Sequence, residues 1–183
     1  PLADRPRLAP GVPGGTTPVR LMNDDLAVSL AAGGRLDTLL GAADFATSPA
    51  VDPGGDVGRA LCLAVDPDLL VTVNAMTAGY VVADAPDGLG TAAHPGTGQA
   101  AAVAWLDRLR ALAKRMCVVA TPYAQADLGA LQRVGDRRLG TAATTTTADI
   151  VDQILGIGSM RGTTVLGDGP LTPSAVELLD GQG

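Results

Sequence analysis

The sequence predicts an α/β fold in which parallel strands are joined by helical crossovers. Three short apolar runs, at 59–66, 117–121 and 163–168, have the length and composition of buried strands. An amphipathic segment follows each of these runs. This alternating order requires right-handed crossovers, so the strands should be largely parallel, with the helices packed outside them.

The composition is that of one globular domain, and it excludes several classes of ligand. The 183 residues suit a single domain, 1–183, because 46% of them are apolar and 17% are charged. Aromatic residues make up 2% of the chain, too few for a stacking platform for nucleic acid or sugars. The net charge of −6 opposes binding to a phosphate backbone, so we expect no nucleic-acid partner. The chain opens at Pro1 without an initiator Met, which indicates a piece excised from a larger protein.

Two helices between loops are expected in the N-terminal part. Residues 1–20 are rich in Pro and Gly and show no period, so they predict an extended loop. The first helix should begin after Asn23 as its N-cap and stop at Gly33. The second covers 36–43, and residues 47–58 form another loop.

A long loop and the clearest helix follow the first strand. That strand ends at Asp66, and Pro67 suits the first position of a helix that continues over 68–77. The Gly, Ala and Pro content of 79–98 predicts a long loop, which we expect to be mobile or dependent on a partner. Apolar positions recur every three to four residues over 99–116 and predict a helix there.

The C-terminal part repeats the strand and helix pattern. A strand at 117–121 precedes an amphipathic helix over 124–134. A second helix should begin at a capping box and cover 146–155, because a Thr stands three residues before an Asp. A last helix follows the third strand and covers 172–179, with Pro at its start and Gly after its end.

The two cysteines, Cys62 and Cys117, each stand in an apolar run that begins a βα unit. We expect them in the interior on neighbouring parallel strands, close together but unpaired. The alternative is a disulfide, which an oxidising compartment would permit.

Ligand sites in parallel α/β folds lie beyond the carboxyl ends of the strands, and this rule selects Asp66, Asp68, residues 121–123 and Asp168. Asp66 and Asp68 suit acid and base roles in glycoside hydrolysis, or they cap the helix that follows them. Tyr123 suits contact with a sugar, or it packs over the strand ends. Asp168 is a further candidate carboxylate, although Asp-Gly also favours a simple turn. We favour the structural role in each case.

His94 is the single histidine of the chain and therefore the default general base or ligand-binding group. The alternative is a solvated side chain in a loop. With one His in the whole chain, a metal site would lack sufficient ligands. We therefore expect no metal and no cofactor.

Five stretches over about residues 1–139 resemble one actinobacterial family: PLADRPRL, DDLAVSLAAGGRLDTLL, LAVDPDLL, WLDRLRAL and TPYAQADLGALQRVG. Its members are uncharacterised envelope proteins encoded beside the lipid II flippase MurJ. The resemblance implies a secreted, membrane-anchored protein in the extracytoplasmic envelope, of which this chain is an internal domain. It also implies similarity to the domains of polysaccharide deacetylases and glycoside hydrolases, and hence a partial or distorted (β/α) barrel.

The resemblance adds three candidate residues. Asp4 stands in LADRP, which would follow a first strand preceding this sequence, and it is a further candidate catalytic carboxylate. The family carries an acid after Pro-Tyr, where this chain has Gln125 first and Asp127 behind it. Both are candidates for ligand binding.

Two functions remain open at this point. The missing metal ligands favour a non-catalytic or degenerate (β/α) domain that acts as a scaffold or binding module in cell-wall assembly. Its partner would be an envelope protein or the cell-wall glycan. The alternative is a carbohydrate-active hydrolase that uses two carboxylates at the strand ends.

Overall fold

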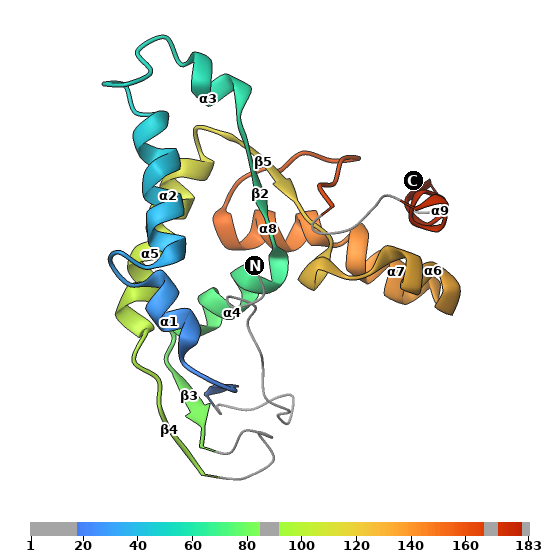
Figure 1. The fold of residues 1–183 in the computed structure, drawn as a ribbon, viewed down its shortest axis with the longest axis horizontal. Helices are drawn as coiled ribbons and strands as arrows, with labels where there is room; N and C mark the ends of the chain where they lie inside the picture. Colours follow the sequence, from blue (N-terminus) through green and yellow to red (C-terminus); the bar gives the residue numbers. More distant parts are fainter. Residues whose placement is uncertain (1–17, 85–91, 167–171, 181–183) are drawn as a thin grey trace. The chain divides into compact units, whose positions relative to one another are not determined.

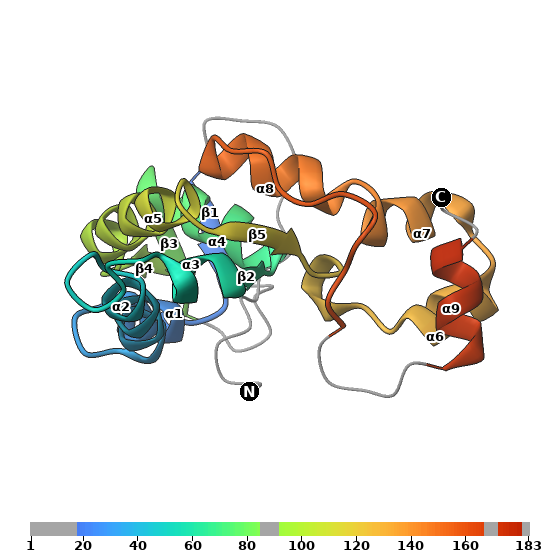
Figure 2. The ribbon, with the colours of Figure 1, turned by 90° about the horizontal axis from the view of Figure 1, so that it is seen from above.

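The computed structural model describes residues 18–84, 92–166 and 172–180. The chain forms two compact units, and Figures 1 and 2 label their helices and strands. The first unit comprises Pro1–Val57 and Val71–Leu112, and the second comprises Gly58–Leu70 and Ala113–Gly183. The mixture of helices and parallel strands that the sequence predicts is confirmed.

A three-stranded sheet in the order β1-β3-β4 belongs to the first unit. Strand β1 (Val19–Leu21) pairs with β3 (Tyr80–Ala83) in parallel, and β4 (Ala93–Pro95) pairs with β3 in the antiparallel direction. The expectation of a loop over 79–98 is therefore wrong for these two strands, although residues 85–91 lie outside the described part. Alternate residues of β3 turn inward, and Tyr80 and Val82 are each 4% exposed, so this strand carries core side chains.

Helices of the first unit follow the predicted periodicity. They are α1 (Asp25–Leu30), α2 (Arg35–Ala46) and α5 (Gln99–Ala113), with most of α4 (Pro67–Thr77). The indole of Trp105 is buried and donates a hydrogen bond to the carbonyl oxygen of Leu36 at 3.1 Å, which joins α5 to α2. A short helix, α3 (Asp56–Ala60), begins inside the segment expected to be a loop.

Asp24 connects distant parts of the first unit. Its Oδ1 accepts a hydrogen bond from the Tyr80 hydroxyl, and its Oδ2 accepts from the backbone N–H of Thr97 at 3.0 Å and the Thr97 hydroxyl at 2.6 Å. The Tyr80 oxygen in turn accepts from the N–H of Gly98 at 2.9 Å. A Cβ on Gly96 would stand 2.0 Å from the Tyr80 ring, so only glycine allows this loop to close over it.

In the second unit, β2 (Cys62–Val65) and β5 (Cys117–Ala120) form a parallel pair. The register places Cys62 opposite Cys117 and Val65 opposite Ala120. The remaining elements of this unit are η1 (Tyr123–Gln125), α6 (Leu128–Val134), α7 (Arg137–Thr144), α8 (Thr147–Leu155) and α9 (Pro173–Asp180). Helices α6 and α9 share a small apolar cluster of Leu128, Ala175 and Leu178.

Three expectations for the second unit need correction. The helix predicted over 124–134 is divided into η1 and α6, because two residues with positive φ break it. Helix α7 was not expected, and Asp136 begins it as a side-chain cap. Residues 163–166 do not form a strand; the segment makes a side-chain hydrogen bond from Thr164 to the carbonyl of Ala120 rather than a ladder with β5.

Cys62 and Cys117 form a disulfide, so the expectation of two unpaired thiols is wrong. Their Cα atoms lie 4.4 Å apart because the register makes them direct partners, and this distance falls within the range of disulfides. The expected neighbouring parallel strands are confirmed. The expected position in the interior is wrong, since Cys62 is exposed and Cys117 is half-buried.

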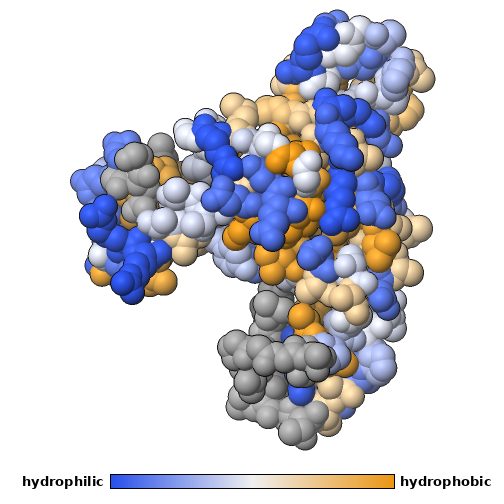
Figure 3. All heavy atoms as spheres, turned by 180° about the vertical axis from the view of Figure 1, so that it is seen from behind, coloured by the Kyte–Doolittle hydropathy of each residue, from blue (hydrophilic) through white to orange (hydrophobic). Residues whose placement is uncertain are grey.

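The described strands form one three-stranded sheet and one two-stranded sheet, and they do not close into a barrel. A (β/α) barrel is therefore not confirmed. Apolar side chains also remain on the surface, and Figure 3 shows hydrophobic residues scattered among hydrophilic ones on one face. Scattered exposure of this kind is normal for a folded protein.

The ionised carboxylate of Asp24 is expected to stabilise the first unit. Partial burial raises its pKa, but the hydrogen bonds from Thr97 and Tyr80 outweigh burial and hold the pKa below its ordinary value of 3.8. The contribution is therefore complete above about pH 4 and is lost as the pH falls through the folded-state pKa. Asp24→Asn should lower the free energy of unfolding by about 1 to 2 kcal/mol at pH 7.

Urea unfolding at pH 7 and at pH 3 measures this effect. The difference between Asp24→Asn and the wild-type protein should shrink at the lower pH. Asp25→Asn is the matched control, because Asp25 is an exposed neighbour in the first turn of α1. A difference that is independent of pH would contradict the assignment.

The disulfide should be detectable by counting thiols in the unfolded, unreduced protein. We expect no free thiol before reduction and two after it. Because the bond closes a loop with a sequence separation of 55, the variant Cys62→Ser/Cys117→Ser should lose about 2 to 4 kcal/mol of stability. Two free thiols in the air-oxidised protein would refute the pairing.

Candidate functional site

The carboxyl ends of β2 and β5 meet at one edge of the two-stranded sheet. The backbone N–H of Thr121 donates to the carbonyl of Val65 at 3.0 Å, which extends the pairing one residue beyond β5. Asp66 follows β2 directly, and Pro122 and Tyr123 follow Thr121. Parallel pairing therefore brings Asp66, Asp68 and Tyr123 together, as the sequence predicted for the strand ends.

Asp66 uses one carboxylate oxygen to hold two backbone segments. Its Oδ1 accepts hydrogen bonds from the N–H of Asp68 at 2.9 Å and from the N–H of Ala124 at 3.2 Å. The first bond caps α4, whose opening residue Pro67 is fully buried. The second bond fixes the turn after β5, so this carboxylate has the structural role that the alternative interpretation gave it.

Asp68 is engaged by the hydroxyl of Tyr123. Burial raises the pKa of Tyr123 to about 12, and the hydrogen bond to Asp68 and the charges of Asp68 and Asp66 act in the same direction. The phenol therefore stays protonated at neutral pH and serves as a donor. Both side chains are half-buried, so the pair lies at the surface of the strand ends.

The turn after β5 is strained. Ala124 has φ 50° and ψ 25°, and Gln125 also has φ 50°. Consecutive left-handed conformations in residues with a side chain cost about 1 kcal/mol or more each, so the surrounding bonds must hold them. Hydrogen bonds from Gln125 to Pro122 and from Ala126 to Tyr123, both 3.0 Å, do so together with Asp66. A turn at Pro122 and Tyr123 is what the sequence predicts, but no Gly or Asn marks the left-handed positions that follow.

The remaining candidates lie apart from this cluster or outside the described residues. Asp127 caps α6 and accepts from the N–H of Ala130 at 2.9 Å. The side chain of Gln125 is exposed. His94 belongs to the first unit, where its Nδ1 lies 2.7 Å from a carboxylate oxygen of Asp84 and both side chains are largely exposed. Asp4 and Asp168 fall outside the described residues.

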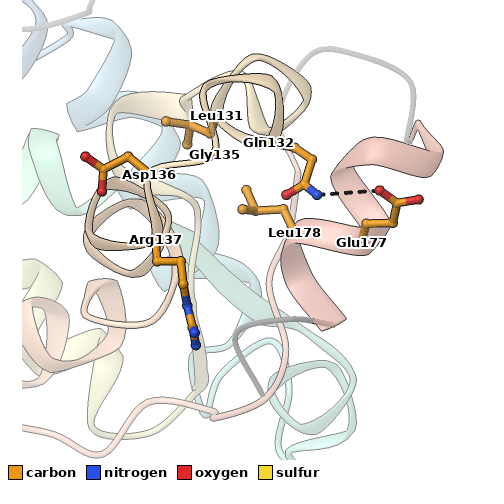
Figure 4. Close-up of a pocket in the computed structure, with 7 residues that line it drawn as sticks. All are labelled: Leu131, Gln132, Gly135, Asp136, Arg137, Glu177 and Leu178. Carbon is orange, nitrogen blue, oxygen red and sulfur yellow. Dashed lines mark hydrogen bonds between the residues drawn. The ribbon is translucent and has the colours of Figure 1, made fainter.

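A cavity that the sequence did not predict lies between α6 and α9, with a volume of about 360 Å³. Figure 4 shows Gln132 and Glu177 facing each other, and their side chains are joined by a hydrogen bond of 3.5 Å. Asp136 on the lining is occupied by the backbone N–H groups of Arg138 and Leu139. Gln132, Glu177 and Asp136 on the lining therefore already have partners within the protein.

Metal ligands do not cluster in the described part of the chain, where no three His, Cys, Asp or Glu side chains are placed to share one ion. Comparisons of the chain with family models, with curated proteins and with solved structures find no match. The chemistry of the strand ends therefore has to be judged from the geometry. Asp66 and Asp68 are acceptors already in use, and Tyr123 is a protonated donor held by one of them.

Removal of the Asp66 carboxylate should destabilise the second unit. Asp66→Ala leaves the N–H groups of Asp68 and Ala124 without this acceptor and releases the strained turn, for an expected loss of about 1 to 3 kcal/mol. Asp127→Ala, which removes only the side-chain cap of α6, should cost about 1 kcal/mol. Chemical unfolding of both variants measures the difference. If Asp66→Ala costs no more than Asp127→Ala, Asp66 does not hold the turn.

Proposed function

We propose that this chain is a non-catalytic or degenerate (β/α) domain of an extracytoplasmic envelope protein, acting as a scaffold or binding module in cell-wall assembly. The observation that supports the proposal is that the carboxylates at the strand ends already accept hydrogen bonds from the protein itself. Asp66 holds two backbone N–H groups, and Asp68 holds the hydroxyl of Tyr123. An acid and base pair for hydrolysis needs carboxylates that face a substrate rather than the protein's own backbone.

The disulfide supports the extracytoplasmic location. Cys62 and Cys117 are bonded across β2 and β5, and Cys62 is exposed to solvent. Disulfides persist in oxidising compartments and are reduced in most cytosols. The pairing is thus the state expected of a domain that works outside the cytoplasm.

The resemblance to the actinobacterial family encoded beside MurJ provides the cell-wall setting of the proposal. On this proposal the full-length protein is secreted and membrane-anchored, and the present parallel pairs are parts of a distorted (β/α) barrel. The partner is an envelope protein or the cell-wall glycan, and the net charge of −6 disfavours nucleic acid. None of the helices among the described residues has the length and hydropathy needed to cross a lipid bilayer.

A carbohydrate-active hydrolase is the second candidate. It is favoured by one observation, the presence of two carboxylates and a tyrosine at the same strand ends. This function requires Asp66 or Asp68 to exchange its present partner for a substrate or a water molecule.

Binding to purified peptidoglycan sacculi distinguishes the two functions. We expect the domain to co-sediment with sacculi and to release no reducing sugar or muropeptide. A release of sugar that Asp68→Asn abolishes, while the melting temperature stays within a few degrees, would establish the hydrolase instead. If the domain captures a defined envelope protein but does not bind sacculi, the partner is that protein. If the domain binds neither sacculi nor an envelope protein, the binding role is overturned.

The location is tested separately by trapping thiols in intact cells with a maleimide reagent before lysis. We expect Cys62 and Cys117 to be protected until a reductant is added. Labelling of both thiols without reductant would place the domain in a reducing compartment.

A further inference from the structure

A second cavity of the second unit, with a volume of about 500 Å³, lies beside the carboxyl end of β5. The junction between α7 and α8 forms one side of it, residues 160–164 form another, and Leu179 of α9 contributes from a third element. We call it the threonine cleft, because five threonines line it: Thr144, Thr145, Thr147, Thr163 and Thr164. Its volume falls within the range of small-molecule sites.

Three of these threonines are fixed by their own hydroxyl groups. Thr144 donates to the carbonyl of Gly140 at 2.8 Å, Thr147 donates to that of Thr144 at 2.6 Å, and Thr164 donates to that of Ala120 at 3.2 Å. Thr147 is buried, whereas Thr144 and Thr164 are half-buried and their hydroxyl oxygens keep lone pairs with which to accept a further hydrogen bond. The orientation of the lining is therefore set before any ligand arrives.

Thr145 and Thr163 complete the polar lining from opposite sides. Both residues are exposed at the cleft, one at the end of α7 and the other in the segment after Gly162. A hydroxyl group can both donate and accept, so these two side chains suit a ligand that itself carries hydroxyl or amide groups.

Arg161, on the lining of the cleft, is paired with two carboxylates. Arg161 Nη1 lies 2.8 Å from Asp149, and Nη2 lies 2.5 Å from Asp152. The guanidinium is thus already paired with carboxylates, and a phosphate or carboxylate ligand would compete with both of them. The cleft therefore disfavours an anionic ligand.

Apolar groups make up the rest of the surface. Ala120, Ala148, Met160 and Leu179 line the cleft together with the threonine methyl groups. A matching ligand needs hydroxyl or amide groups for the threonines and small apolar groups for this part.

We propose that the threonine cleft binds a neutral glycan that carries acetamido groups. The acetamide provides a donor, an acceptor and a methyl group within one substituent, and the sugar hydroxyls match those of Thr145 and Thr163. This inference rests on the proposed binding role in the cell wall and names the site and the ligand class for it. On this proposal the strand-end cluster of Asp66, Asp68 and Tyr123 stabilises the fold, and the threonine cleft binds the glycan.

Titration with chitotetraose, a neutral tetramer of N-acetylglucosamine, tests the inference by NMR. We expect saturable shifts of the backbone amides around Thr145 and Thr163, and weaker binding of cellotetraose, which lacks the acetamido groups. The variant Thr145→Val/Thr163→Val keeps the volume but removes two hydroxyls, so its dissociation constant should rise by at least about fivefold. Thr38→Val, an exposed position on α2 in the first unit, is the control and should bind as the wild type does.

The outcomes separate this inference from the proposed function. Absence of saturable shifts, shifts centred on other residues, or unchanged affinity of the double variant would each overturn the cleft as the glycan site. If the domain still co-sediments with sacculi in that case, the binding role stands and its site lies elsewhere. If the domain binds neither sacculi nor chitotetraose, the cell-wall glycan is not its partner. The glycan-binding role and the assignment of the threonine cleft then both fail.

Discussion

The parallel pairing of β2 with β5 is the constraint on which the second unit depends. Its register makes Cys62 and Cys117 partners at one end and brings Asp66 beside the turn after β5 at the other. A shift of one residue would turn the side chains of one strand to the opposite face. The disulfide fixes the register covalently. The hydrogen bond from the N–H of Ala124 to Asp66 holds the same register beyond the ends of the strands. The same strand end also borders the threonine cleft through Ala120.

Each unit uses an aspartate and a tyrosine in a similar way. Asp24 follows β1 and bonds Thr97, 73 residues away, while Asp66 follows β2 and bonds Ala124, 58 residues away. Tyr80 in the first unit and Tyr123 in the second donate to carboxylates, and burial raises the pKa of both to about 12. Acidic side chains at the strand ends of this protein therefore join loops that are distant in sequence.

This use of carboxylates bears on function. A carboxylate whose oxygens accept hydrogen bonds from the protein's own N–H and O–H groups does not present them to a substrate. The threonine cleft differs because Thr145 and Thr163 are exposed, and because its arginine is paired with Asp149 and Asp152. The occupied carboxylates at the strand ends and the exposed hydroxyls of Thr145 and Thr163 support the proposal of recognition rather than hydrolysis.

The sequence by itself determined the elements whose signals are local. Periodic apolar residues and Pro67 located α2, α4 and α5, and short apolar runs located β2 and β5, because helix periodicity, capping and strand composition are properties of neighbouring residues. Only the tertiary structure decided the antiparallel pairing of β3 with β4, the disulfide, the left-handed turn at Ala124 and the threonine cleft. Each depends on groups that are far apart in the chain, and their proximity is set by packing and register, which no local pattern records.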